Sequence, residues 1–233
     1  MAIYGISDVH LSLSENKSME VFGPVWHNYV EKIKENWIKV IKDEDTVIIA
    51  GDISWANKLE EAYEDFKYLD SLPGKKIILK GNHDFFFTTK TKIDNFLKEN
   101  NFNTIEVLHN NSYEACGYII AGTRGWGKVD NEAENLDNDK IYAREAIRLE
   151  LSIKDGIQKF GEDKKIIVVM HFPPFQKPFQ EVLSMYKDKI EVCIYGHLHG
   201  AGHFSIKEGI IEDINYKMVS VDYTDFTPIK LTN

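Results

Sequence analysis

The chain has 233 residues, of which 43% are apolar and 28% charged, and its formal net charge is −9. No segment approaches the roughly 20 consecutive apolar residues of a bilayer span, and the composition is ordinary, which excludes disordered, collagen-like, coiled-coil and integral membrane proteins. The net negative charge also disfavours extended, non-specific binding to a nucleic-acid backbone.

Six short and uniformly apolar runs predict strands that are buried on both faces, as in a largely parallel sheet. In chain order these strands are Ala2–Ser7, Thr46–Ala50, Lys76–Leu79, Tyr118–Ala121, Lys165–Met170 and Glu191–Tyr195.

Apolar residues recur at helical spacing in three intervals between these strands, from Trp26 to Ile41, from Leu59 to Leu69 and from Tyr142 to Phe160. The second helix is predicted to begin at Asn57, whose spacing to Glu60 resembles a capping box, and the third to end before Gly161. We interpret the three apolar stripes as core packing.

The last part of the chain, after Gly200, predicts antiparallel strands at Gly202–Lys207, Gly209–Asn215 and Lys217–Val221. The segment Asp130–Asp139 carries five carboxylates in ten residues. It has Asn135 where a calcium-binding EF-hand loop needs glycine, so we interpret it as a solvated loop.

The chain shows no repeat, low-complexity tract or flexible linker, so we expect a single domain over residues 1–233. It enters a strand-like run at Ala2 without the charged and apolar regions of a signal peptide. Its two cysteines, Cys116 and Cys193, cannot form a disulfide framework and predict reduced thiols. These features predict a cytoplasmic protein without membrane insertion.

Side chains of the metal-ligand type follow five of the predicted strands. They are Asp8 and His10, Gly51-Asp52, Gly81-Asn82-His83-Asp84, His171, and Gly196-His197-Leu198-His199. Residues two apart in an extended chain point to the same side, so Asp8 with His10, and His197 with His199, can each form a two-pronged clamp. Ligands of open α/β sheets bind at the carboxyl ends of the strands, so we expect these groups to converge.

Each of these residues alone has an ordinary structural explanation. A single histidine after a strand is most often a hydrogen-bonded surface residue, and Asp52 after Gly51 could be a turn or capping residue. One shared site explains the presence of such residues at all five strand ends far better than five unrelated structural roles do.

The order of these blocks resembles the calcineurin-like metallophosphoesterase superfamily, and the resemblance extends from residue 8 to residue 199. It implies an α/β fold, a four-layer αββα sandwich in which two mixed sheets pack face to face with helices outside. Members of the protein serine/threonine phosphatase branch continue the Gly-Asp block with Asp-Arg-Gly and end the third block in Glu. This chain has Ile53-Ser54-Trp55 and Asp84 instead, which argues against that branch.

The resemblance also implies a dinuclear metal site. The first ion would bind Asp8, His10, Asp52 and His199, and the second Asp52, Asn82, His171 and His197, with Asp52 bridging. Mixed imidazole and carboxylate ligands favour transition metals, so we expect Mn, with Fe, Zn or Ni as alternatives. A metal-bound hydroxide would attack the phosphorus in line, His83 would be the catalytic histidine, and Asp84 the carboxylate that orients it.

The expected substrate is a small phosphodiester or phosphomonoester. Phe85-Phe86-Phe87 follows the third block and could form a wall for an organic group or pack under the loop. Arg124 also leaves a strand end, and is either a phosphate clamp or part of a structural salt bridge. The chain has only two other arginines, Arg144 and Arg148, against 25 lysines.

His203 lies close to the last block and could reach the rim of the site. Two other functions stay open. One is a nuclease of the same superfamily, which the acidic charge weakly disfavours. The other is a non-catalytic binding module on the same fold, although such modules typically lose ligands that this chain retains.

Overall fold

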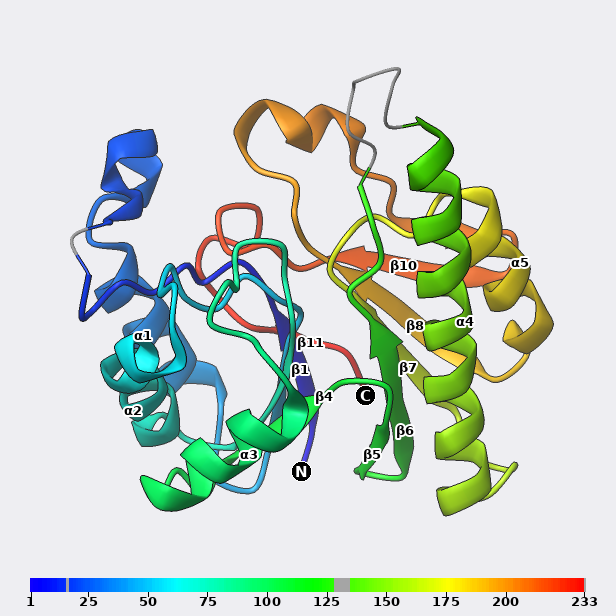
Figure 1. Ribbon diagram of the computed structural model, residues 1–233, viewed down its shortest axis with the longest axis horizontal. Helices are drawn as coiled ribbons and strands as arrows, with labels where there is room; N and C mark the ends of the chain where they lie inside the picture. The colour runs from blue at the N-terminus through cyan, green and yellow to red at the C-terminus, as the bar shows by residue number, and fades with distance from the viewer. Residues whose placement is uncertain (16, 128–134, 233) are drawn as a thin grey trace.

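The computed structural model describes residues 1–15, 17–127 and 135–232, which form two β-sheets with helices on their outer faces (Figure 1). The first sheet has the order β11-β1-β2-β3-β4, and the second the order β5-β6-β7-β8-β10-β9. The strands of the first sheet are β1 (Ile3–Ile6), β2 (Thr46–Ile49), β3 (Lys75–Leu79), β4 (Ile105–Leu108) and β11 (Ile229–Lys230). Those of the second are β5 (Ser112–Ala115), β6 (Tyr118–Thr123), β7 (Ile166–Met170), β8 (Ile190–Tyr195), β9 (Gly209–Ile211) and β10 (Ile214–Met218).

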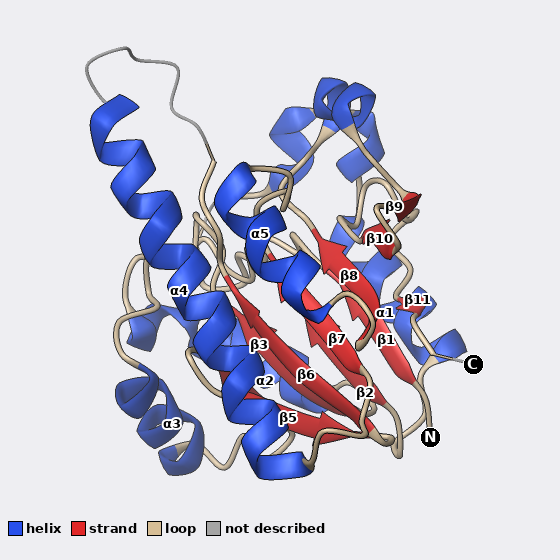
Figure 2. Ribbon diagram, turned by 90° about the vertical axis from the view of Figure 1, so that its right-hand side faces the viewer, coloured by secondary structure: helices blue, strands red, loops and turns tan. Residues whose placement is uncertain are grey.

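Three layers of apolar side chains hold the sandwich together. Successive strand residues face opposite sides, so Ile48 of β2 points between the sheets while Val47 and Ile49 point outward. The outward residues of the first sheet pack against α1 (Tyr29–Val40), α2 (Tyr63–Ser71) and α3 (Lys90–Glu99), and those of the second against α4 (Asn135–Phe160) and α5 (Lys177–Tyr186). Figure 2 shows α4 and α5 lying across the second sheet. The expected four-layer αββα sandwich is confirmed.

Both sheets are mixed, and their inner strands are parallel. β1, β2, β3 and β4 pair in parallel, as do β6, β7, β8 and β10, while β5, β9 and β11 are antiparallel edge strands. The N–H of Val221 donates to the carbonyl of Ser7 at 3.1 Å, and a parallel bridge joins Ser7 to Ser220. The end of β1 is thereby held against the segment that follows β10.

All six strands predicted from the apolar runs are present, but the prediction after Gly200 is partly wrong. Gly202–Lys207 was expected to be a strand, whereas Gly200–Ser205 is a 3₁₀ helix. Its Gly-Ala-Gly start offers a sheet only one methyl group to pack. Gly209–Asn215 and Lys217–Val221 are also not the true strands, because Glu212 and Asp213 form a left-handed turn between β9 and β10. Moreover, β10 pairs in parallel with β8.

Two further predictions, each concerning the start of a helix, differ from the structure. Glu61, not Glu60, caps the second helical segment, because its carboxylate accepts the N–H groups of Asn57 and Lys58 at 3.1 Å each. Residues 135–139 of the acidic segment begin α4 instead of forming a loop. In general, carboxylates near the N-terminus of a helix stabilise it, because they are attracted by the positive end of its dipole. Residues 128–134 of that segment lie outside the described part of the chain. Within the described ranges, none of the helices combines the length and apolar character that crossing a bilayer requires.

Candidate metal centre

The site residues sit in tight turns directly after the strands. Asp8, His10, Asp52 and His197 have φ values of 60°, 44°, 51° and 74°, a left-handed backbone that side chains with a Cβ rarely adopt. Such strain clusters where a structure holds functional groups in fixed positions.

Two glycines allow the ends of β2, β3 and β7 to approach one another. Gly51 has a φ of +100°, and a Cβ there would lie 2.6 Å from Nδ1 of His171 and 2.8 Å from Cα of Gly81. A Cβ at Gly81 would clash with the Asp52 carboxylate. Glycine is therefore required at both positions for Asp52 and His171 to meet.

The structure brings the predicted ligands together in two overlapping groups that could each hold a metal ion. Donor atoms of Asp8, His10 and His199 lie within 4.8 Å of one another, and so do those of Asp8, Asp52 and His171. Nε2 of His10 is 3.6 Å from Oδ2 of Asp52, and Nε2 of His171 is 3.5 Å from the same oxygen. Asp8 is common to both groups, and Oδ2 of Asp52 lies near one imidazole of each, so the predicted bridging role of Asp52 stays a prediction.

Asn82 and His197 complete the cluster on its other side. The side-chain oxygen of Asn82 lies 2.7 Å from Nε2 of His171 and 2.9 Å from Nδ1 of His197. The seven predicted ligands thus lie around one point at the strand ends.

The donor set fits divalent cations. Oδ1 of Asp8 and Nε2 of His199 lie 3.3 Å apart, and neither has a hydrogen-bond partner within the described residues although both are buried. Asp8 and Asp52 also place two nearly inaccessible carboxylates side by side, with exposures of 0% and 1%. Buried charges of one sign require compensation, which a divalent cation provides.

The imidazoles of the cluster differ in charge. Burial lowers the pKa of His10 and of His171 to about 3, so both rings are neutral and have a lone pair for a cation. Burial also lowers the pKa of His199, but contacts with Asp222 and Asp8 raise it to about 10. Burial and the neighbouring Asp8 carboxylate raise the pKa of Asp52 to about 9.

Asp222 supports the cluster from outside, and the sequence analysis missed it. Its carboxylate accepts from Nδ1 of His199 at 2.8 Å and lies 3.3 Å from Nε2 of His203, which reaches the rim of the site as expected. Ser220 donates a 2.6 Å hydrogen bond to Oδ2 of Asp8. Asp222 follows the predicted strand Lys217–Val221, so the strand-end rule that found the other residues also applies to it.

His83 and Asp84 are adjacent in sequence but have separate environments. The backbone N–H of His83 donates to Oδ1 of Asp52 at 2.8 Å, and its half-buried ring lies 4.6 Å from the ring of Trp55. The buried carboxylate of Asp84 accepts from the backbone N–H groups of Ile53, Ser54 and Gly81 at 2.7 to 3.1 Å. Among the described residues no hydrogen bond joins Asp84 to the His83 ring. The contacts of Asp84 in this structure hold the loop, and its predicted action on the His83 imidazole stays a prediction.

The comparison with protein families decides the identity of this fold and site. The model of the calcineurin-like phosphoesterases matches residues 1–201. The chain belongs to this family. A comparison with curated proteins finds no significant match.

Solved structures share the phosphoesterase fold at low sequence identity. A protein of unknown function from Aquifex aeolicus is 21% identical, with a TM-score of 0.50, and the match covers 98% of this chain and 95% of that one. Phosphopantetheinyl hydrolase from Mycobacterium tuberculosis is 13% identical, with a TM-score of 0.54 and coverage of 97% and 90%. A Thermus thermophilus protein is 14% identical, with a TM-score of 0.52 and coverage of 84% and 81%.

A mainly apolar cavity of about 440 Å³ opens beside the candidate metal centre. Its walls include Phe22, Val25, Trp26 and Trp55, and its polar side is formed by His10, His83, His199 and Asp222. Trp55 stacks on His10 with ring centroids 4.9 Å apart. The sequence analysis did not find the two tryptophans, because nothing in their local pattern separates them from core residues.

The phenylalanine cluster is divided between core and surface. Phe86 and Phe87 are buried at 0% and 3% exposure and pack in the apolar layer between the first sheet and its helices, so they form no wall at the candidate metal centre. Phe85 is exposed, with its ring 6.3 Å from that of His83.

Arg124 takes part in no ion pair within the described residues; its guanidinium lies over the ring of Trp126, 5.0 Å from the centroid. The described part of the chain thus gives Arg124 no structural salt bridge.

Proposed function

We propose that this chain is a dinuclear-metal-dependent phosphohydrolase that cleaves a small phosphodiester or phosphomonoester. The observation that carries the proposal is the convergence of seven imidazole, carboxylate and amide side chains around the buried Asp52, whose Oδ2 lies 3.6 Å from Nε2 of His10 and 3.5 Å from Nε2 of His171. Two cations at one carboxylate are the arrangement that two-metal hydrolases use to clamp an ester.

In this proposal one ion binds Asp8, His10, Asp52 and His199, and the other binds Asp52, Asn82, His171 and His197. The first set is supported by the close donor atoms of Asp8, His10 and His199. The second is supported by the contacts of Asn82 with His171 and His197. Imidazole and carboxylate donors without thiolate favour Mn, with Fe, Zn or Ni as alternatives.

When bound, the two cations would lower the pKa of a shared water and polarise the phosphoryl oxygens. Two divalent ions less the charges of Asp8 and Asp52 leave roughly +2 at the site, which attracts a phosphate ester although the chain carries −9. His83 would donate its proton to the leaving oxygen, and Asp84 would hold the loop from which His83 and Asn82 project.

The cavity beside the site supports a compact organic ester as substrate. Its wall of Phe22, Val25 and the two tryptophans suits an aryl or other apolar group. An aryl diester such as bis(4-nitrophenyl) phosphate should be cleaved with Mn. The fold shared with phosphopantetheinyl hydrolase makes pantetheine phosphoesters a second class to test.

Two other functions remain as alternatives. A nuclease would degrade duplex DNA in a strongly salt-sensitive way without cleaving small esters. A non-catalytic module would bind metal and ligand without turnover.

We also expect a cytoplasmic protein, and the two cysteines are unpaired, in keeping with that prediction.

The test is a metal-reconstituted screen. Chelation should abolish phosphoesterase activity, and Mn or another transition ion should restore it, with bound metal measured on the same samples. The substrates are monoesters, diesters, nucleotides and oligonucleotides. Full activity in the metal-free chain would overturn the proposal, and turnover of duplex DNA alone would favour the nuclease.

Asp222→Asn should weaken metal binding without unfolding the chain. A neutral amide accepts from Nδ1 of His199 more weakly than the carboxylate does and makes Nε2 a weaker donor to a metal, and loss of such outer partners lowers metal affinity by about 10- to 100-fold. The measurement is a Mn titration, with thermal unfolding of the metal-free variant. The matched control is Asp213→Asn, which breaks only an exposed 2.7 Å ion pair with Lys187. Unchanged Mn affinity in Asp222→Asn would show that Asp222 does not support the site.

Asp84→Asn should destabilise the loop as a whole. The Asp84 carboxylate accepts three backbone N–H groups, and an amide would face at least one of them with a donor. A buried donor without a partner costs about 1–3 kcal/mol. Chemical denaturation should show that loss of stability, and Mn affinity should fall because Asn82 shares the loop. A slower rate with normal stability and metal content would instead support a direct action of Asp84 on His83.

A further inference from the structure

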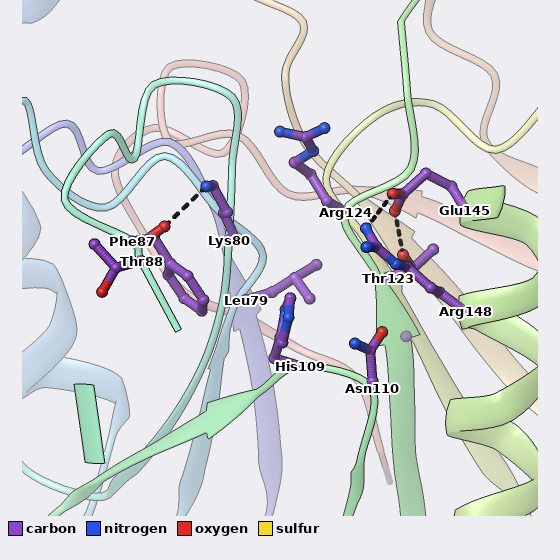
Figure 3. Close-up of a pocket in the computed structure, with 11 residues that line it drawn as sticks. Leu79, Lys80, Phe87, Thr88, His109, Asn110, Thr123, Arg124, Glu145 and Arg148 are labelled. Atoms are coloured by element: carbon purple, nitrogen blue, oxygen red, sulfur yellow. Dashed lines mark hydrogen bonds and ion pairs between the residues drawn. The ribbon is translucent and has the colours of Figure 1, made fainter. Parts of the chain in front are cut away.

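A second cavity, of about 270 Å³, lies between the two sheets where β3 and β6 end. Figure 3 shows Lys80 on one side of it, and Arg124, Glu145 and Arg148 on the other, with His109 and Asn110 between them. Cavities that enclose whole small ligands typically measure roughly 300–1,000 Å³, so this one suits a single chemical group.

The arginines of the chain gather at this cavity. The sequence has three arginines among 28 basic residues, and two of them, Arg124 and Arg148, line the cavity. The third, Arg144, lies just outside, with Nε 3.8 Å from Oε1 of Glu145. The planar guanidinium group of arginine binds phosphate and carboxylate through paired hydrogen bonds, which the ammonium group of lysine cannot form. Selective placement of arginine indicates an oxyanion.

The charges that line the cavity do not balance within the protein. Glu145 is the one carboxylate among the lining residues, and it is committed to Arg148 at 2.5 Å and to the Thr123 hydroxyl at 2.7 Å. Lys80 donates only to the carbonyl of Phe87, at 3.0 Å. The cations of Lys80 and Arg124 are thus left without a carboxylate partner in the described part of the chain.

Arg124 is the most available of these cations. No hydrogen bond reaches its guanidinium from the described residues, and its stacking on Trp126 holds the group in place while leaving the N–H donors unused. Burial lowers the pKa of Arg124, the carboxylate of Glu145 opposes this shift, and the like charge of Arg148 adds to it. A partly buried cation beside another cation is stabilised when an anion binds between them.

The cavity and the metal centre are built on the same strand ends. The carbonyl of Arg124 accepts from the N–H groups of His171 and Phe172 at 3.2 and 3.0 Å. Lys80 directly precedes the Gly81-Asn82 pair. A molecule that binds at the candidate metal centre could therefore extend between the two sheets into this cavity.

We propose that this cavity is an oxyanion-binding site that takes a phosphoryl group through Arg124, Arg148 and Lys80. The phosphoryl group belongs either to the substrate, as a second phosphate remote from the bond that is cleaved, or to free inorganic phosphate. The first source rests on the proposed function, whereas binding of the anion does not.

The first experiment is a calorimetric titration of the full chain with inorganic phosphate, with Mn and again with a chelator. Under chelation no metal ion can bind phosphate, whereas the cations that line the cavity remain. Arg124→Gln should weaken phosphate binding by about tenfold or more, the typical value of a hydrogen bond to a charged group. Arg124→Lys keeps the charge but loses the paired hydrogen bonds of the guanidinium group, so its phosphate affinity should lie between those of Arg124→Gln and the wild type.

Arg144→Gln is the matched control, because Arg144 is 56% exposed and does not line the cavity. Its phosphate affinity should stay within about twofold of the wild type, as expected for an exposed charge. Thermal unfolding verifies that each variant is folded. Equal phosphate affinity in the wild type, Arg124→Gln and Arg124→Lys would overturn the proposal.

The second experiment separates the two sources. An aryl phosphate that carries an additional remote phosphate is compared with the same ester without it. If the site holds a substrate phosphate, the ratio of the two KM values should change about tenfold in Arg124→Gln and not in Arg144→Gln. If it holds free phosphate, the ratio stays constant while inhibition by phosphate weakens. Absence of ester hydrolysis with an intact difference in phosphate binding would reject the proposed function alone.

Discussion

Asp52→Asn should lower phosphoesterase turnover by about 10³-fold or more, because a two-metal clamp supplies several kcal/mol and each 1.4 kcal/mol is a factor of ten. The substitution keeps the size of the side chain, and the amide oxygen can still accept the 2.8 Å hydrogen bond from the His83 backbone. In the metal-free chain the pKa of Asp52, raised to about 9 by burial and by Asp8, keeps this carboxyl protonated at neutral pH, so the amide replaces an uncharged group. The metal-free variant should therefore unfold at the wild-type temperature or above it.

Mn should raise the unfolding temperature of the wild type and leave that of Asp52→Asn nearly unchanged. Binding to the native state alone stabilises by RT ln(1 + [L]/Kd), so this shift reports affinity directly. Bound-metal analysis should find the loss larger than in His197→Ala, where only one of the proposed sites loses a ligand. Two retained ions in Asp52→Asn would contradict the bridging role.

The strand-end rule explains why so much of the site was predictable. Polar residues such as Asp8, Asp52 and His171 follow runs of buried β-branched residues, and parallel strands bring their carboxyl ends to one edge. Asp222 obeys the same rule, but it has neither a neighbouring histidine nor a glycine turn to draw attention to it. The rule identifies residues that reach the edge of the sheet and does not give their partners.

The partners depend on backbone turns that the sequence pattern does not specify. Phe85 donates its N–H to the carbonyl of His83, and Phe87 to that of Asp84, so successive side chains in this loop point in different directions. Asp84 consequently faces the backbone of Ile53 and Ser54, while His83 faces the cavity. Adjacent residues in a tight turn need not share a task.

Similar reasoning applies to the fold. The buried strands were predicted because both of their faces are apolar, whereas β4, β5 and β11 are short edge strands, and polar residues such as Glu106 and Glu114 interrupt their pattern. The helix α3 was missed because only Ile93 and Leu97 are buried along its ten residues. Elements that bury little surface leave a weak periodic signal.

His83→Ala should separate chemistry from metal binding. The His83 ring lies on the cavity side of the site, 4.6 Å from Trp55 and 5.6 Å from His10. Its contact with Asp52 is made by the backbone N–H, which alanine retains. The variant should therefore hold its metals and fold normally. Loss of general acid catalysis typically costs about 10²–10⁴-fold in rate, and kcat should fall by that amount.

The leaving group distinguishes an acid from a residue that acts in another way. A nitrophenolate departs with little need of a proton, so His83→Ala should slow an alkyl ester much more than a nitrophenyl ester. His27→Ala is the matched control, because the His27 side chain is 71% exposed, and both rates should stay at the wild-type value. Equal slowing of the two esters in His83→Ala would remove the proton donor role, and release of a metal ion would make His83 a ligand. With metal content intact and an effect that grows with the pKa of the leaving alcohol, the proton that reaches the departing oxygen comes from this imidazole.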